Sequence, residues 1–468
     1  MTSIRSGERS SDPLAALLTP PDYRSDYATS LDTSVPWRNP SEVEIAGRHY
    51  TVVRPRIRDP RFHLAAVIIS LHVLGQTVLD FDVSILQILA AVGTAGLIGF
   101  VVTLVSDRTI AWPASAVLAG NGVAFILRVP GTQHGEWWSA RGWWIFSATA
   151  ALGLASKYVI RWKGRHIFNP SNFGLVVAFL VLGSNRADPL PFWCGPQSGA
   201  TIAALVVIGV GGVAIVIRLG IAAIAVSFWV AFASSLAVVA ASDHCLAAPW
   251  HLGPVCGREF WWTLVTSPEI LVFMFFMITD PKSSPTGRVR RVVYGASIGF
   301  LATLLASPQT TEFATKVAVL SALAIVCAAR PLFEPRLPAA DASDDRLGRF
   351  VLGFRHPGRL PLRPLAVAAT IVVTGTLLVV LAPNSIEATA TASETDGSVA
   401  ARPEFGPDEL SRPEVVVNPS DRVAARLEPA TVTAIGRDVT EDLAIIERAR
   451  REQRPALLAT ATGESTLE

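Results

Sequence analysis

Three polar segments interrupt long apolar stretches of this 468-residue chain, and their residue types could do chemistry. In the first, a basic run that contains Arg165 and His166 leads directly into Asn169 and Pro170. Asn is a favoured helix N-cap and Pro suits the first helical position, so a helix that begins here presents free N–H groups beside basic side chains. Such an end can bind an anion such as phosphate, although anchoring at lipid headgroups explains the basic residues more simply.

The other two segments are rich in hydroxyl groups. Thr279, Asp280 and Pro281 lead into a Ser-Ser-Pro-Thr-Gly turn that contains Ser284 and Thr286 and is closed by arginines. This composition is typical of a short rigid turn, and an ordinary loop between two helices is the alternative. The third segment consists of Ser198, Gly199, Ala200 and Thr201 at the start of an apolar stretch. Small residues of this kind are also common where helices pack in membranes.

Ionisable residues inside apolar stretches indicate function, because burying a charge in a membrane is costly. Glu269 follows Pro268 in a strongly apolar stretch, and we expect it to belong to a cation or proton pathway. The alternative is that Pro268 and Glu269 cap a broken helix that faces other helices. His72 and Lys316 are weaker candidates, since each could reach an interface or form a single interhelical bond.

Cys245 and Cys256 flank a short segment that contains His251. In an oxidising compartment they could form a disulfide, and two unpaired thiols are equally compatible with the sequence. His244 and His251 lie nearby, but their spacing matches no zinc or haem motif, so no metal site is predicted.

The composition identifies the environment in which these segments must be positioned. Half of the residues are hydrophobic and 17% are charged, whereas soluble chains carry about a quarter charged residues. The formal net charge is only +2, and the basic residues form short runs rather than a basic face. We therefore expect the lipid bilayer, and no nucleic acid, as a partner. Residues 1–60 are polar and contain no signal-peptide core, so the first span is expected to direct insertion.

Eleven stretches approach the roughly 20 apolar residues that a helix needs to cross a bilayer. These stretches are 62–80, 85–105, 112–128, 142–160, 168–184, 200–217, 219–241, 260–279, 292–307, 311–329 and 364–382. The expected fold is an all-α polytopic membrane protein of about ten to eleven transmembrane helices.

Basic residues in short loops predict the orientation, because they resist translocation. Loops after even-numbered spans contain Arg108, Lys157, Arg161, Lys163, Arg165, Arg218, Lys282, Arg288, Arg290, Arg291, Arg330, Arg336, Arg346, Arg349, Arg355, Arg359 and Arg363. Loops after odd-numbered spans contain only Arg128, Arg141, Arg186 and Arg258. The sequence thus predicts a multi-pass protein of the inner or plasma membrane with a cytoplasmic N-terminus and an extracytoplasmic C-terminus.

This topology divides the chain into five predicted parts. They are a largely unstructured cytoplasmic segment (1–60), a membrane core of ten spans (61–330), a basic cytoplasmic loop (331–363), an extra transmembrane helix (364–382) and an acidic, mostly disordered extracytoplasmic tail (383–468).

Taken in order, the three polar segments resemble the NqrB/RnfD family, the membrane subunits of sodium-pumping NADH:quinone oxidoreductase and of the Rnf electron-transport complex. The resemblance covers roughly residues 60–330. Its most specific parts are Gly164 through Pro170 and Thr279 through Thr286. The extra span and the acidic tail are additions, and they favour the UnbU-type branch found in enediyne biosynthetic clusters.

The resemblance implies a flavin cofactor. In the family, a Ser/Thr-Gly-Ala-Thr motif carries FMN through a phosphoester bond on its threonine, and Thr201 is the matching residue here. The family motif usually opens with an Asp three residues before the Ser or Thr, where this chain has Gly195. The resemblance also marks a set of candidate cofactor-binding residues, namely Ser198, Gly199, Ala200, Thr201, Arg165, His166, Asn169, Thr279, Asp280, Ser284 and Thr286.

Three functions are compatible with the sequence. The first is a non-catalytic subunit of an oxidoreductase complex, which holds FMN and passes electrons to partner subunits, with or without ion coupling. The second is a secondary transporter for a small molecule, with Asn169-Pro170 and Asp280-Pro281 as corresponding helix breaks. The third is a cofactor-free membrane partner whose outer tail recruits another subunit.

Overall fold

The structure of this chain is a computed structural model. It describes residues 41–45, 47–53, 59–191, 199–247, 254–340 and 345–352, together with the single residues 441, 444, 445 and 448. Ser198, the expected span 364–382 and nearly all of the expected tail therefore lie outside the described residues. The chain separates into two compact units, residues 1–385 and 386–468, and the fold below is that of the first unit.

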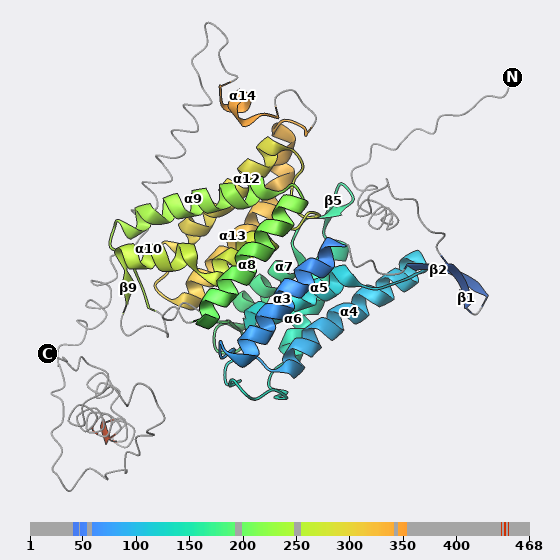
Figure 1. Cartoon of the computed structure of the whole chain (residues 1–468), viewed down its shortest axis with the longest axis horizontal. Helices are drawn as coiled ribbons and strands as arrows, with labels where there is room; N and C mark the ends of the chain where they lie inside the picture. Colours follow the sequence, from blue (N-terminus) through green and yellow to red (C-terminus); the bar gives the residue numbers. More distant parts are fainter. Residues whose placement is uncertain are drawn as a thin grey trace. The chain divides into compact units, whose positions relative to one another are not determined.

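Helices dominate the described residues (Figure 1). They are α3 (Pro60–Thr77), α4 (Ile85–Asp107), α5 (Ala114–Ile126), α6 (Trp143–Val159), α7 (Pro170–Leu182), α8 (Gly199–Arg218), α9 (Ala222–Ala240), α10 (Gly257–Thr266), α11 (Pro268–Val272), the π-helix η1 (Phe273–Met277), α12 (Arg288–Ala306) and α13 (Glu312–Phe333), followed by the short η2 (Glu334–Arg336) and α14 (Leu347–Leu352). Helix occupies each of the first ten predicted stretches.

Five of these helices, α4, α8, α9, α12 and α13 with its η2 extension, are long and apolar enough to cross a membrane. A sixth span results if α10 and the α11–η1 segment, which meet at a bend of 41°, count as one. At 13 residues each, α5 and α7 are apolar but measure about 20 Å, less than a bilayer core of about 30 Å. The chain is mostly helical, and its long apolar helices are those of a membrane-embedded protein.

Short strands pair at the ends of the helices. β1 (Ser41–Ile45) and β2 (Arg48–Val53) form an antiparallel hairpin, and β2 pairs in parallel with β3 (Thr109–Ala111) directly after α4. The remaining pairs are antiparallel, namely β4 (Leu127–Arg128) with β7 (Asp188–Pro189), β5 (Arg161–Trp162) with β6 (Arg165–His166), and β8 (Cys245–Leu246) with β9 (Val255–Cys256). The hairpin departs from the expectation of a largely unstructured segment over 1–60. Its Val43-Glu44-Ile45 alternation and the positive φ of Gly47 (73°) explain the two strands and their turn.

Three of the helices begin with the same sequence feature, a polar N-cap residue followed by proline. Asp59, Asn169 and Ser267 each precede a proline, and each accepts a hydrogen bond from a backbone N–H in the first turn of α3, α7 or α11. The proline itself lacks the N–H that would otherwise need a partner at this position. A polar cap followed by Pro therefore specifies these helix starts through the local sequence.

The connecting loops gather at two ends of the helical bundle. At the β4–β7 end, Arg128 bonds both Asp82 (2.9 Å) and Asp188 (2.6 Å), which joins the loops that follow α3, α5 and α7. At the β5–β6 end, the Arg291 guanidinium donates to Gly220 O (2.6 Å) and links the loop after α8 to the start of α12. The chain thus alternates between the ends, as a polytopic helical protein requires.

Glycines allow the central helices to approach closely. A Cβ on Gly153 of α6 would lie 2.3 Å from Pro170 O, and one on Gly174 of α7 would lie 2.4 Å from Thr149 O. A second close contact joins α9 and α12, where a Cβ on Gly295 would lie 2.4 Å from Ile224 O. Small residues at helix contacts are typical of membrane bundles, in which packing rather than the hydrophobic effect holds helices together.

The outward faces of the helices are apolar. Val105 of α4 is 73% exposed and Val210 of α8 is 68% exposed, which fits a lipid environment and would be costly in water. Four exposed tryptophans, Trp137, Trp138, Trp143 and Trp144, lie at the β4–β7 end. Tryptophan is enriched where membrane proteins meet the headgroup layer.

Candidate functional site

The first turn of α7 carries the Asn169-Pro170 segment. Asn169 Oδ1 accepts hydrogen bonds from Asn172 N (3.2 Å) and Ser171 Oγ (2.8 Å), while its Nδ2 donates to Met277 O (3.1 Å). Asn169 therefore caps α7 and at the same time fastens it to the end of η1. The neighbouring Asn172 Nδ2 donates to Leu320 O (3.0 Å) of α13, which makes this turn a junction of three helical segments.

The loop after η1 carries the Thr279–Thr286 segment. Asp280 Oδ1 accepts from Lys282 N (3.2 Å) and Asp280 O accepts from Ser284 N (2.9 Å), so the loop is closed by its own aspartate. Thr279 Oγ1 donates to Phe275 O inside the π-helix, where widened turns leave carbonyl groups to be satisfied in this way. Thr279 and Ser284 are buried, whereas Thr286 is exposed and takes no part in the junction.

The two segments meet at the β5–β6 end. His166 Nε2 lies 3.2 Å from Asp280 Oδ2, and the Arg165 guanidinium donates to Pro281 O. Burial opposes ionisation of Asp280, but the contact with His166, the Ser283 hydroxyl and the Lys282 N–H outweigh it and hold the pKa of this carboxyl below its usual range. A charged Asp280 thus ties the loop to β6.

This junction does not present the open anion site that the sequence suggested as one interpretation. The Asn169 side chain occupies the capping position of α7, and Arg165 and His166 are directed to the loop after η1. The described contacts of these residues are therefore protein contacts that join the start of α7 to the loop after η1, so the two positions expected as corresponding helix breaks are a helix start and a loop. We call this set of contacts between the start of α7 and the loop after η1 the lock. Its residues are Arg165, His166, Asn169, Thr279, Asp280 and Ser284.

Thr201 lies far from the lock. It is in the first turn of α8 and is 8% exposed, next to the exposed Gly199, whose Cβ position faces open space. The 20 residues of α8 span about 30 Å, and the far end of α8 leads to Gly220, which contacts Arg291 just beyond the lock. The candidate cofactor-binding residues therefore form two groups at opposite ends of α8.

Glu269 lies at a helix break rather than in the middle of a straight span. Ser267 caps α11 by accepting from Ile270 N (3.2 Å), and Glu269 occupies the first turn after the bend. Its Oε1 is 3.5 Å from the Lys316 ammonium, which is also 2.8 Å from Glu312 Oε1. The backbone here thus matches the alternative of a capped break that faces other helices. Lys316, a weaker candidate from the sequence, lies at the centre of the cluster that it forms with Glu269 and Glu312.

A cavity of about 50 Å³ opens beside this cluster, between α5, α11, η1 and α13. Its walls are almost entirely apolar and include Phe125, Leu264 and Phe273, and Glu269 and Lys316 provide its charged side. Sequence reasoning missed Glu312 as a member of this cluster. Its i, i+4 spacing to Lys316 on one helix is the signal that could have found it.

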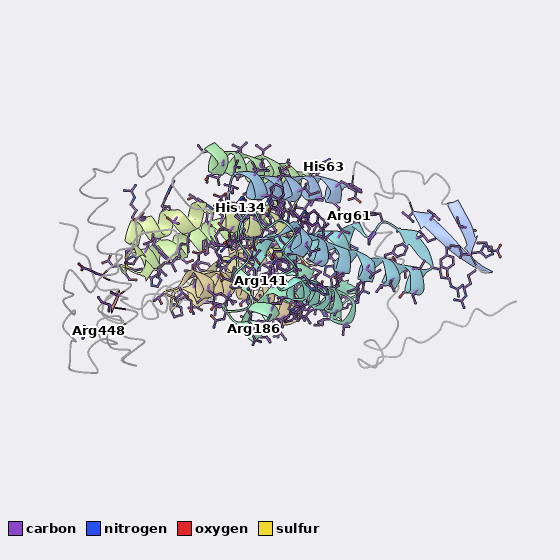
Figure 2. The ribbon with its side chains drawn as sticks, turned by 90° about the horizontal axis from the view of Figure 1, so that it is seen from below. Arg61, His63, His134, Arg141, Arg186 and Arg448 are labelled. Atoms are coloured by element: carbon purple, nitrogen blue, oxygen red, sulfur yellow. A yellow bond between two sulfur atoms is a disulfide. The ribbon has the colours of Figure 1, made fainter. Side chains whose placement is uncertain are left out.

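Two further predicted residues have defined positions. Cys245 and Cys256 form a disulfide that closes the β8–β9 pair, so of the two alternatives the structure has the bonded one. His72 Nε2 lies 3.1 Å from Asn121 Oδ1, a single bond between α3 and α5. Figure 2 shows the side chains of the bundle and marks His63, which contacts Arg218 (3.3 Å) where α3 and α8 adjoin.

No protein-family model matches this chain, and no curated protein matches it.

Proposed function

We propose that this protein is a membrane-embedded electron-transport subunit with an NqrB/RnfD-like core that holds FMN near the start of α8. The observation that supports the proposal most directly is the lock, the contact between the start of α7 and the loop after η1. The two segments on which the resemblance rests, 164–170 and 279–286, lie more than a hundred residues apart in the chain, yet they contact each other through His166 and Asp280. Two unrelated motif matches would have no reason to form one structural unit.

The first turn of α8 suits the phosphate of FMN in two respects. The helix N-terminus presents backbone N–H groups and a positive dipole end, and the open space at Gly199 leaves room beside Thr201. When bound, FMN supplies one- and two-electron redox chemistry. The chain's own part is to hold the phosphate at the Thr201 hydroxyl and, through the low exposure of this side chain, to limit the access of water.

The test is whether the purified full-length protein carries flavin. We expect the visible absorbance of oxidised flavin and an intact mass increased by one FMN, and we expect Thr201→Ala to remove the mass increase. Thr77→Ala is the control, because Thr77 is an exposed threonine whose hydroxyl donates to Val73 O of its own helix. A colourless protein that takes up no added FMN would contradict the proposal.

The topology proposed with this function has eleven spans, a cytoplasmic β5–β6 end and an extracytoplasmic β4–β7 end. It is supported by the basic residues, which concentrate in the loops of the β5–β6 end. Impermeant thiol reagents added to intact cells test it. A cysteine introduced at Glu136 should react, and one introduced at Lys163 should react only after permeabilisation.

Transport is the second candidate function, and the bend of 41° between α10 and α11 favours it. Interrupted helices with an ionisable residue at the break are the usual construction of sites in secondary transporters. Export of a small molecule from cells should then be lost in Glu269→Gln, whereas unchanged export would count against transport through this residue.

A further inference from the structure

The strand β1 forms an open edge of the three-stranded sheet, whose order is β1-β2-β3. Its inner edge pairs with β2 along the whole strand. Among the described residues, no strand pairs with its outer edge. Residues 42–45 are all exposed, and the apolar side chains of Val43 and Ile45 are 42% and 47% exposed. An exposed strand edge is a template on which another extended chain can pair.

The register of the hairpin shows which backbone groups point outwards. Glu42 lies opposite Thr51, and Thr51 N donates to Arg108 O (3.0 Å), next to β3 on the other side of β2. Glu42 and Thr51 are therefore a non-hydrogen-bonded pair, and the N–H and C=O of Glu42 point away from β2. Because this pattern repeats every two residues, the backbone groups of Glu44 point outwards as well, whereas those of Val43 face β2. Glu42 and Glu44 thus each offer one donor and one acceptor to a further strand.

The side chains of this edge restrict which strand can pair with it. Both residues with outward backbone groups are glutamates, so an antiparallel pairing of β1 with a second copy of itself would place a glutamate directly opposite a glutamate. Like charges in this position are destabilising, whereas opposite charges stabilise a pair of strands. A strand with Lys or Arg at positions i and i+2 would place a cation opposite each carboxylate. The edge is therefore complementary to a basic strand and unsuited to a second copy.

The sheet is fastened to the helical bundle, so a strand added to β1 would be connected to it. β2 pairs in parallel with β3, which directly follows α4 (Figure 1). The start of α4 belongs to the β4–β7 end, where Ile85 N donates to Trp137 O (2.8 Å). The hairpin therefore belongs to the opposite, β5–β6 end, and a strand could reach β1 without entering the bundle.

We propose that the outer edge of β1 is a docking site for an extended basic segment of a partner protein, which adds to the sheet as a further strand. Backbone hydrogen bonds to Glu42 and Glu44 would hold the segment, and the two carboxylates would select its basic side chains. This inference does not depend on flavin binding. In the proposed topology the partner lies on the cytoplasmic side.

The test uses the full-length protein in nanodiscs of zwitterionic lipid, which does not itself attract a cationic peptide. The probe is a fluorescein-labelled peptide in which lysine alternates with valine, and the matched control peptide has glutamate in place of each lysine. We expect saturable binding of the lysine peptide, measured by fluorescence anisotropy, and no binding of the glutamate peptide. Hydrogen exchange followed by mass spectrometry should show that the bound peptide slows exchange at the amides of Glu42 and Glu44.

Variants of Glu44 separate strand addition from attraction between charges. Glu44→Pro removes one outward N–H without removing a bond to β2, and should weaken peptide binding about tenfold. Glu44→Gln keeps this N–H and removes the charge, so we expect a loss of about threefold. Glu44→Lys should weaken binding about tenfold, because it replaces an attraction with a repulsion. Glu136→Lys makes the same change of charge in an exposed loop at the β4–β7 end, and should leave the affinity unchanged.

Four results would overturn the proposal. Absence of saturable binding of the lysine peptide, or equal binding of both peptides, would show that the edge selects no basic strand. An equal loss in Glu44→Lys and Glu136→Lys would show attraction to the overall charge of the protein. Unchanged affinity in Glu44→Pro would exclude strand addition, provided that slow exchange at residues 48–53 shows the hairpin intact. Slow exchange of the Glu42 and Glu44 amides without peptide would show that another part of this chain, a second copy or the lipid surface already covers the edge.

Discussion

His166 Nε2 lies 3.2 Å from Asp280 Oδ2, across 114 positions of the chain. The contact joins β6, just before α7, to the loop after η1. Asn169 reinforces it from the same side by donating to Met277 O (3.1 Å). The start of α7 and the end of η1 are thereby held together at one end of the bundle, and the stability of each should depend on the other.

Replacing one partner of this contact should destabilise the protein. His166→Ala leaves a carboxylate that keeps its contacts with Ser283 and the Lys282 N–H but has lost the imidazole, and His166 itself is only 5% exposed. We expect a loss of about 1–3 kcal/mol in the free energy of unfolding, the cost of removing a partner from a buried polar group. Thermal unfolding in detergent, followed by circular dichroism, measures it. His49→Ala, on the exposed face of the β1–β2 hairpin, should change nothing.

A double-mutant cycle shows whether the two residues act through each other. His166→Ala and Asp280→Asn together should cost less than the sum of the two single changes, because the second change removes a contact that is already lost. Fully additive costs would mean that His166 and Asp280 contribute independently, and the lock would then not depend on their contact.

The lock should weaken in acid. Because its folded-state pKa lies below the usual value, ionised Asp280 stabilises the folded protein at every pH above its unfolded pKa of about 4. As the pH falls from there through the lower folded-state pKa, that contribution is lost. Unfolding temperatures of wild type should therefore fall more steeply below about pH 4 than those of Asp280→Asn. Parallel pH profiles for the two proteins would contradict this assignment.

The sequence predicted the helices well because their signals are local. Apolar runs of membrane length and the polar caps Asp59, Asn169 and Ser267 lie within the segments that they specify. The hairpin at 41–53 was missed because the prediction read residues 1–60 by composition, which conceals a short alternating pattern. The eleven-span count and its orientation remain predictions.

The candidate sites were less predictable because they depend on contacts between distant segments. Nothing near Lys316 in the sequence shows that Glu269, on another helix, lies 3.5 Å away. The resemblance brought Arg165 and Thr201 into one candidate set, whereas the length of α8 separates them. Spacing along one helix, as between Glu312 and Lys316, is the part of such a cluster that a sequence can reveal.

Reduction of the Cys245–Cys256 disulfide should loosen the β8–β9 connection. The bond closes a loop with a separation of 11 residues, for which loop-closure entropy predicts about 3 kcal/mol. A reducing agent should lower the unfolding temperature of wild type and leave that of a Cys245→Ser, Cys256→Ser double variant unchanged. In peptide mass spectra, both cysteines should be alkylated only after reduction. Alkylation of either one without reduction would show that the bond is absent.

Glycine positions provide a prediction with opposite signs at two sites. Gly153→Ala places a Cβ 2.3 Å from Pro170 O, a backbone atom that cannot move aside without displacing the start of α7. We expect a loss of about 1–3 kcal/mol from this overpacking, and a corresponding drop in the unfolding temperature.

Gly209 of α8 is the matched control, because a Cβ there meets nothing within 4 Å. At such a position, Ala favours the helix over Gly by about 0.5–1 kcal/mol, so Gly209→Ala should leave the unfolding temperature unchanged or raise it. Thermal unfolding of the two variants in the same detergent measures the difference. Equal effects at both positions would contradict the close packing of α6 on α7.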